Sequence, residues 1–281
     1  MSLLTTTVDI FSDEVLADPY PTYRTLRDLG STIWLEKTGA CFIGRYADVR
    51  RALNDWQVFS SAQGIGFNPV INAAWEQALI CQDPPFHTAR RKLMMEALGP
   101  AALKPVADTI EQRASALAER VAAMGTFDAV ADFALDLPVG VVMDLIGWPL
   151  DVRARLLDLA SGSWNAAGPT NARMEQGLGG LQDMMNLLTT LYDEERVLPG
   201  GFAAKLIAAS HRGEITRDTA IGMLAGYVVA AFETTISAMA AGVQLFADNP
   251  TEWNKLRADP RLATAAANEI VRMETPLQNF A

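Results

Sequence analysis

The sequence predicts a mainly α-helical fold with one small β-sheet, arranged as a single domain over residues 1–281. Half of the residues are hydrophobic, which is enough to bury a large core. Strand-like runs occur only near the N-terminus, and most of the remaining chain divides into helix-length segments at Pro, Gly or Asn. We find no internal repeat that would indicate a solenoid.

The N-terminal segment supplies the predicted sheet. A short helix ending at Gly30 precedes two strand-like runs, residues 32–35 and 40–43, and a turn signal that contains Gly39 joins them. This pattern predicts a hairpin. A further helix is expected from Tyr46.

The chain from residue 60 onward begins with a predicted loop and is then almost wholly helical in pattern. Residues 60–70 are rich in Gly, Ser, Asn and Pro, and long loops in compact domains often carry function. A helical region follows the motif DPPFHTARRKLMMEAL. The later predicted helices are residues 101–123, 139–146, 150–159, 175–196, 202–210, 217–247, 251–257 and 262–274.

Charge and cysteine content narrow the function classes. The net charge is −10 with a pI near 4.7, and the basic residues are scattered, which argues against nucleic acid and anionic membranes as partners. Cys41 and Cys81 lack the spacing of a zinc site or a disulfide scaffold. The N-terminus lacks the pattern of a secretory signal, so a cytoplasmic location is expected.

The longest predicted helix carries a single ionisable side chain in its central part. Between residues 219 and 247 the only charge is that of Glu233. Thr216 is a suitable N-cap, Asp218 suits the positive first turn, and the sequence DNP at 248–250 is a stop signal. A helix of this length, about 45 Å, is expected to run through the middle of the molecule.

Two structural alternatives compete with a functional role for this helix. The first is a transmembrane span, for which Gly222 and Gly226 give a GxxxG spacing. Glu233 divides the apolar stretch into pieces of 14 residues, which favours a buried core helix instead. The second alternative is a solvent-facing Glu233, which is weakened because the positions three and four residues away are uncharged.

The residues beside Glu233 suggest proton chemistry. A buried carboxylate needs a partner or stays protonated. Thr234 and Thr235 can donate hydrogen bonds to carbonyls of the preceding turn and so loosen the helix locally. An acid, an alcohol and a locally opened helix together predict a proton-delivery site.

Several segments together resemble the cytochrome P450 family of haem monooxygenases in its soluble bacterial form. They are DPYPTYRTLR, GRYADVRRAL, DPPFHTARRKLMMEAL, AAFETT and NEIVRMETPLQ, which occur in the order of the family. The resemblance implies a P450-like fold that ends before the cysteine loop of the family. It also implies haem b, iron protoporphyrin IX, as the cofactor of the complete protein.

The resemblance assigns roles to the AAFETT segment. Thr234 corresponds to the alcohol that hydrogen-bonds oxygen at the iron, and Glu233 to the acid that relays protons. Ala230 and Ala231 are expected against the cofactor. The family usually has Gly where this chain has Ala231, and its β-carbon is expected to narrow the oxygen-binding groove.

Two further pairs follow from the resemblance. His87 and Arg91 match the motif HxxxR and are expected to hold the haem propionates by charge-assisted hydrogen bonds; the alternative is an ordinary helix-start histidine with Arg91 in a solvated basic patch. Glu269 and Arg272 match ExxR and are expected to brace the core beneath the haem; the alternative is an exposed ion pair.

The substrate pocket of the family lies above the haem, and in this chain it should be lined by Ile65, Phe67, Val229 and Leu277, each of which could equally be plain core. The axial cysteine thiolate is expected outside these 281 residues, so the chain provides no metal ligand and, as a fragment, should be inactive.

The complete protein is expected to insert one oxygen atom from O2 into a small hydrophobic substrate. A ferredoxin or flavodoxin-type donor would supply electrons, attracted by Arg90, Arg91 and Lys92. The rival hypothesis is a non-enzymatic helical binding or interaction protein with a truncated P450 fold.

Overall fold

The computed structural model describes residues 3–279 and confirms a mainly helical fold with a small sheet. The strands are β1 (Leu4–Thr6), β2 (Ile33–Leu35) and β3 (Ala40–Phe42). The α-helices are α1 (Asp13–Ala17), α2 (Tyr20–Leu29), α3 (Tyr46–Asn54), α4 (Pro69–Ala74), α5 (Phe86–Leu98), α6 (Pro100–Leu103), α7 (Ala107–Met124), α8 (Asp136–Ile146), α9 (Leu150–Ser163), α10 (Ala172–Asp193), α11 (Phe202–His211), α12 (Arg217–Asp248), α13 (Pro250–Ala258) and α14 (Ala263–Met273). Shorter helical turns are η1 (Leu79–Cys81), η2 (Lys104–Val106), η3 (Ala129–Ala134), η4 (Trp164–Ala167) and η5 (Pro260–Leu262).

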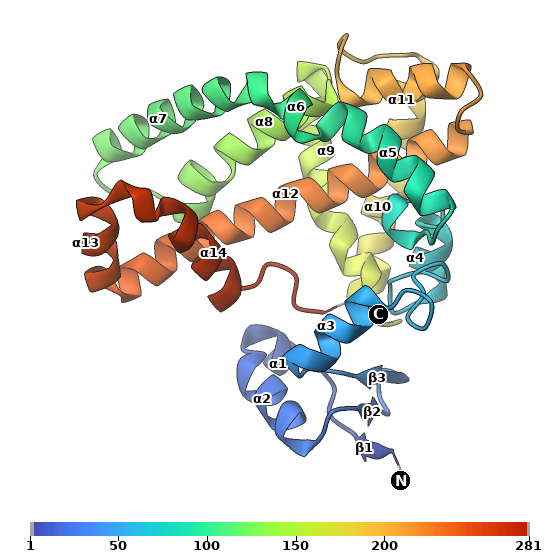
Figure 1. Cartoon of the computed structure of the whole chain (residues 1–281), viewed down its shortest axis with the longest axis vertical. Helices are drawn as coiled ribbons and strands as arrows, with labels where there is room; N and C mark the ends of the chain where they lie inside the picture. The colour runs from blue at the N-terminus through green and yellow to red at the C-terminus, as the bar shows by residue number, and fades with distance from the viewer. Residues whose placement is uncertain (1–2, 280–281) are drawn as a thin grey trace.

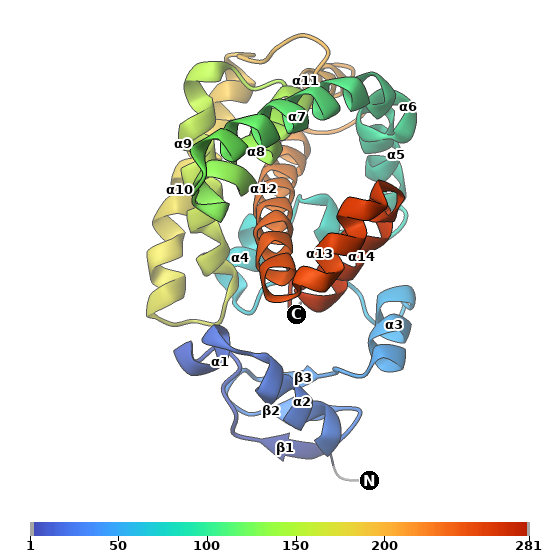
Figure 2. The same cartoon turned by 90° about the vertical axis from the view of Figure 1, so that its left-hand side faces the viewer.

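Helix α12 runs through the centre of the molecule (Figure 1). Its 32 residues span about 48 Å at the rise of an α-helix. Figure 2 shows α12 with α9 and α10 on one side and α14 on the other. The main hydrophobic core gathers around its buried residues, which include Leu224, Val228 and Phe232. The central helix predicted from the sequence is therefore confirmed.

Both ends of α12 form as its sequence predicts. The Thr216 hydroxyl accepts a hydrogen bond from the amide of Thr219 at 3.1 Å, Asp218 lies in the first turn, and the helix ends at Asp248 with Asn249 as its C-cap. By length and hydropathy α12 could cross a membrane, but 61% of its apolar window is buried inside the protein. Such burial is expected of a core helix.

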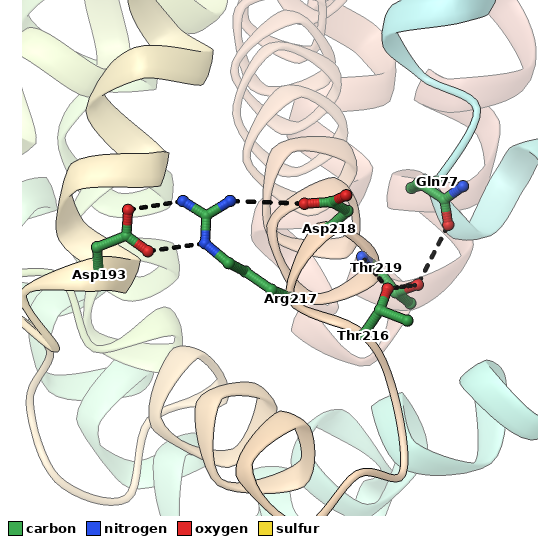
Figure 3. Close-up of polar contacts among 6 residues, drawn as sticks. All are labelled: Gln77, Asp193, Thr216, Arg217, Asp218 and Thr219. Carbon is green, nitrogen blue, oxygen red and sulfur yellow. Dashed lines mark hydrogen bonds and ion pairs between the residues drawn. The ribbon is translucent and has the colours of Figure 1, made fainter.

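Polar contacts fix the first turn of α12 between its neighbours (Figure 3). The Arg217 guanidinium donates to both carboxylate oxygens of Asp193, at the end of α10, at 2.8 and 2.6 Å. On the other side, the Thr219 hydroxyl donates to the side-chain oxygen of Gln77 at 3.1 Å. Arg90 of α5 donates to Thr219 at 3.2 Å and to both oxygens of Gln77. Helix α12 is therefore tied to α5 and α10 by side-chain hydrogen bonds.

The sheet contains the predicted hairpin and one strand that the sequence did not predict. Strands β2 and β3 pair antiparallel, with Trp34 opposite Cys41. Strand β1 pairs parallel with the other edge of β2, with Thr5 opposite Trp34. A second, smaller hydrophobic cluster packs against this sheet and contains Ile10, Tyr23, Leu26, Ile33 and Leu35. The single-domain organisation stays a prediction.

Several sequence-based boundaries need correction. The predicted helix at 101–123 is divided, because the segment Lys104–Val106 forms the tighter turn η2 and contains a proline that lacks an amide donor. The predicted loop at 60–70 ends early, since Asn68 caps α4 by accepting a hydrogen bond from Ile71 at 3.0 Å. Helix α1 and the π-helical segment Ala129–Ala134 were not predicted.

Candidate functional site

A cavity of about 550 Å³ lies against the middle of α12. Its wall is mainly apolar and combines residues from the N-terminal segment, the region of α4, the turn η4, helix α12 and the C-terminal segment. The lining residues are Phe11, Leu16, Ile65, Phe67, Trp75, Ala78, Ile80, Trp164, Asn165, Ala167, Gly168, Arg173, Gly226, Val229, Ala230, Thr234, Leu277 and Asn279.

The four residues predicted to contact a substrate all lie in this wall. Ile65 and Phe67 come from the loop before α4, Val229 from α12, and Leu277 from the segment after α14. These positions are separated by up to 212 residues in sequence (65 to 277) but share one cavity. The fold therefore brings the predicted substrate residues together, and their role stays a proposal.

Aromatic side chains that were not predicted shape the same wall. Trp75 and Trp164 meet edge to face, with ring centroids 6.2 Å apart, and Phe11 meets Phe67 in the same way at 4.7 Å. Phe11 belongs to the N-terminal segment, so its contact with Phe67 depends on the tertiary fold. No local sequence signal could have identified it.

The side chains of Glu233 and Thr234 on α12 point in different directions, one toward α9 and the other into the cavity. Thr234 lines the cavity, and its hydroxyl donates to the carbonyl of Ala230 at 2.8 Å. Glu233 is not among the lining residues; its half-buried carboxylate accepts a hydrogen bond from the Ser161 hydroxyl of α9. Successive helix residues are rotated by about 100°, so neighbouring side chains diverge in this way.

The prediction that Thr234 and Thr235 open α12 locally is wrong. Thr235 donates to the carbonyl of Ala231 at 3.2 Å, as expected for a back-bonded threonine, but the helix continues without a break from Arg217 to Asp248. Glu233 is half-buried rather than buried, because its partner is a serine near the end of α9, where the two helices leave it partly open to solvent.

His87 and Arg91 lie one turn apart on the same face of α5. His87 is half-buried and Arg91 is exposed. Within residues 3–279, neither side chain forms a hydrogen bond or an ion pair, and neither lines the cavity. Arg90 differs, because it is half-buried against Gln77 and Thr219, and burial lowers the pKa of its guanidinium. Arg90 is therefore not part of an exposed basic patch.

Glu269 and Arg272 form a two-bonded ion pair on α14. The Arg272 guanidinium donates to both carboxylate oxygens of Glu269, at 2.7 and 2.6 Å. The pair is exposed, and the hydrogen bonds from Arg272 lower the pKa of the Glu269 carboxyl. In this chain the pair thus has the geometry of a surface i,i+3 ion pair, while its bracing role stays a proposal.

Side chains with the chemistry that a haem group needs lie on two helices, α5 and α12. His87 and Arg91 offer N–H donors that have no protein partners among residues 3–279, which suits the two carboxylates of the cofactor. Ala230 and Thr234 border the cavity on α12, and Ala230 extends only a methyl group into it. A flat group can therefore lie close to this stretch of helix.

Neither cysteine fits as an axial ligand. Cys81 is buried among the apolar side chains of the main core, and this burial, which disfavours the thiolate, raises the pKa of its thiol to about 11. Cys41 is exposed on β3, in the N-terminal sheet. Among residues 3–279, no group of three or more His, Cys, Asp and Glu side chains could hold a metal ion.

Comparison with known proteins identifies relatives among bacterial cytochromes P450. Cytochrome p450 CYP199A2 from Rhodopseudomonas palustris is 35% identical over 277 residues, which cover 97% of this chain and 67% of that protein. Beta-dihydromenaquinone-9 omega-hydroxylase from Mycobacterium tuberculosis is 26% identical and is covered over 56% of its length. No family model matches the chain.

Solved structures show the same fold. CYP109E1 from Bacillus megaterium, determined in complex with testosterone, has a TM-score of 0.79 at 22% identity, and the match covers 93% of this chain and 69% of that structure. P450BioI, determined with an acyl carrier protein carrying hexadec-9Z-enoic acid, has a TM-score of 0.80 at 21% identity, with 92% and 70% covered.

The chain thus belongs to the cytochrome P450 family, whose members are haem-dependent monooxygenases. Its 281 residues form a C-terminally incomplete P450 fold that spans about two thirds of the CYP199A2 relative. Haem b is the cofactor of the complete protein, as it is of the family. The rival hypothesis of a non-enzymatic helical protein is not favoured, since the relatives are enzymes.

Proposed function

We propose that the complete protein inserts one oxygen atom from O2 into a small hydrophobic substrate bound in the cavity beside Thr234. The observation that carries this proposal is the position of the Thr234 hydroxyl in the wall of an apolar cavity, within a chain of the P450 family. Two relatives are named for apolar substrates, a dihydromenaquinone and a steroid, which supports an apolar substrate for this protein.

The cofactor would be held by residues of two helices. His87 and Arg91 of α5 would bind its carboxylates through charge-assisted hydrogen bonds. Ala230, which lines the cavity, and its neighbour Ala231 would lie next to it on α12, where the β-carbon of Ala231 would take space that a glycine leaves open. When bound, haem supplies the oxygen activation that amino-acid side chains lack. The Glu269–Arg272 pair braces the core next to it.

Thr234 and Glu233 act on protons. The Thr234 hydroxyl donates to the Ala230 carbonyl at 2.8 Å, and by rotating it can instead donate toward the cavity. The carboxylate of Glu233 takes up and releases a proton at its oxygen atoms, one of which accepts the hydrogen bond from Ser161. Ile65, Phe67, Val229 and Leu277 exclude water and orient the substrate.

The electron donor would dock on an exposed part of α5. A ferredoxin or flavodoxin-type protein would dock near the exposed Lys92, while Arg91 is assigned to the cofactor and the half-buried Arg90 does not take part. We place the complete protein in the cytoplasm, which its similarity to bacterial cytochromes P450 supports. The 281 residues alone should not catalyse the reaction, because Cys81 is buried in the core, Cys41 is exposed in the N-terminal sheet, and the family resemblance puts the thiolate ligand in a later loop.

The test uses the complete protein with its electron donors and a panel of small apolar compounds under ¹⁸O₂. We expect at least one product with a single ¹⁸O atom, measured by mass spectrometry. Thr234→Ala should lower the amount of product per O2 consumed about tenfold or more. Thr235→Ala is the matched control, because Thr235 makes the same back-bond but does not line the cavity. Equal losses in both variants would contradict the role of Thr234.

A further inference from the structure

One charged side chain, that of Arg173, lies among the residues that line the cavity in the described part of the chain. Arg173 follows the N-cap Asn171 in the first turn of α10. Its guanidinium donates a hydrogen bond to the carboxylate of Asp13 in α1. Apart from Asn165, Thr234 and Asn279, the remaining lining side chains are apolar or glycine. A single positive side chain in an otherwise uncharged wall favours ligands that carry a negative charge.

Arg173 and Thr234 reach the cavity from different helices, α10 and α12. The ion pair with Asp13 places the guanidinium beside α1, whose Leu16 also lines the cavity. Thr234 reaches the cavity from helix α12, as do Val229 and Gly226. A molecule bound in this cavity has a mainly apolar environment and can meet the guanidinium of Arg173 from α10 and the hydroxyl of Thr234 from α12.

The ion pair with Asp13 is easily exchanged. The Asp13 side chain is 89% exposed and that of Arg173 is 47% exposed. An ion pair with so exposed an acid contributes little to stability, because water solvates the released carboxylate almost as well. Arg173 also lines the cavity, so its guanidinium can exchange Asp13 for the carboxylate of a ligand bound there.

We propose, building on the monooxygenase function above, that the substrate is an apolar molecule with a single carboxylate group, which Arg173 binds in place of Asp13. The planar guanidinium matches a carboxylate with two parallel hydrogen bonds. The apolar body then extends along the aromatic wall toward Thr234. Arg173 determines which substrates bind and does not take part in the chemical step.

The test measures binding to the complete, haem-loaded protein by isothermal titration calorimetry, with decanoate and 1-decanol as probes that share one hydrocarbon chain. Decanoate should bind about tenfold more tightly than 1-decanol, the range expected of a hydrogen bond to a charged group. Binding should also change tryptophan emission, because Trp75 and Trp164 line the cavity. Raising the salt concentration should reduce the advantage of decanoate.

Two variants separate ligand binding from a structural role. Arg173→Gln and Asp13→Asn both remove the ion pair. Arg173→Gln should abolish the preference for decanoate, whereas Asp13→Asn should retain it, because an exposed ion pair with Asp13 competes only weakly with the ligand. Circular dichroism should show the same helix content in both variants. A merely structural ion pair predicts equal effects of the two changes.

The other outcomes distinguish this proposal from the function on which it rests. Equal binding of decanoate and 1-decanol, unchanged in Arg173→Gln, would overturn the carboxylate proposal and leave the apolar cavity as a substrate site. Binding of neither probe would overturn both the carboxylate proposal and the assignment of this cavity as the substrate site.

Discussion

The carboxylate of Glu233 accepts a hydrogen bond from the hydroxyl of Ser161, which joins the centre of α12 to the last turn of α9. The acid is therefore held at a contact between two helices, while Thr234 next to it faces the cavity. A proton that moves between Glu233 and the cavity must pass around the helix surface. Ser161 thus fixes the position of the acid.

Replacing Ser161 should weaken this helix contact. Ser161→Ala is expected to lower the free energy of unfolding by about 0.5–1 kcal/mol relative to Ser237→Ala, as measured by urea denaturation. Ser237 is an exposed serine of α12, so both changes give the same gain in helix propensity, and the difference reports the hydrogen bond. In a double-mutant cycle, Ser161→Ala made after Glu233→Ala should show only the gain in helix propensity that Ser237→Ala shows. Independent, additive effects would show that the two side chains do not interact.

Two neighbouring arginines of α5 should differ in their effect on stability. Arg90→Ala removes hydrogen bonds to Gln77 and Thr219 and should cost about 1–2 kcal/mol of the free energy of unfolding. Arg91→Ala is the matched control, because Arg91 is exposed and should change stability by less than about 0.5 kcal/mol. Thermal and urea unfolding measure both values. A larger cost for Arg91 would show that the wrong arginine is assigned to the helix contact.

Two helical glycines should respond to alanine in opposite directions. A β-carbon at Gly222 would lie 2.6 Å from Cβ and 2.9 Å from the carbonyl carbon of Gln77, so Gly222→Ala should destabilise the fold by about 1–3 kcal/mol. Apart from its chain neighbours and the backbone of its own helix, no described atom lies within 4 Å of a β-carbon at Gly162, so Gly162→Ala should stabilise α9 by about 0.5–1 kcal/mol. Equal unfolding temperatures for the two variants would refute the close approach of α12 to Gln77.

The contact between α2 and the C-terminal segment should weaken at alkaline pH. The Tyr20 hydroxyl donates to the Glu274 carboxylate at 2.6 Å, and burial together with this hydrogen bond raises the pKa of Tyr20 from near 10 to about 12. Since the folded-state pKa is raised, the stabilisation is complete below pH 10 and is lost as the pH rises toward 12. The stability difference between the protein and Tyr20→Phe should therefore shrink over this range. A difference that stays constant with pH would refute the coupling.

Local patterns explain why the central helix could be predicted. The long uncharged stretch around Glu233, the N-cap Thr216 and the stop at Asn249 are all signals that short-range interactions produce. The structure confirms these features. Strand β1 escaped prediction because it has three residues and its pairing partner Ile33 lies far along the chain.

The candidate site could be predicted only in part, for a similar reason. The residues Ile65, Phe67, Val229 and Leu277 reach one cavity as the family resemblance implied. Arg173 could not be found in this way, because its place in the wall depends on the docking of α1 against α10. The divergence of Glu233 and Thr234 follows from helix geometry, but the partner Ser161 depends on how α9 crosses α12.

The absorbance spectrum of the reduced protein under carbon monoxide tests the central claim most directly. The claim is that these residues form the cavity side of a haem site while the thiolate ligand comes from outside them. With haem added, the 281-residue chain should show no thiolate-type Soret band, and the protein that includes the cysteine loop should show one. A thiolate-type band from the 281 residues alone would contradict the account, because it would make Cys41 or Cys81 the ligand.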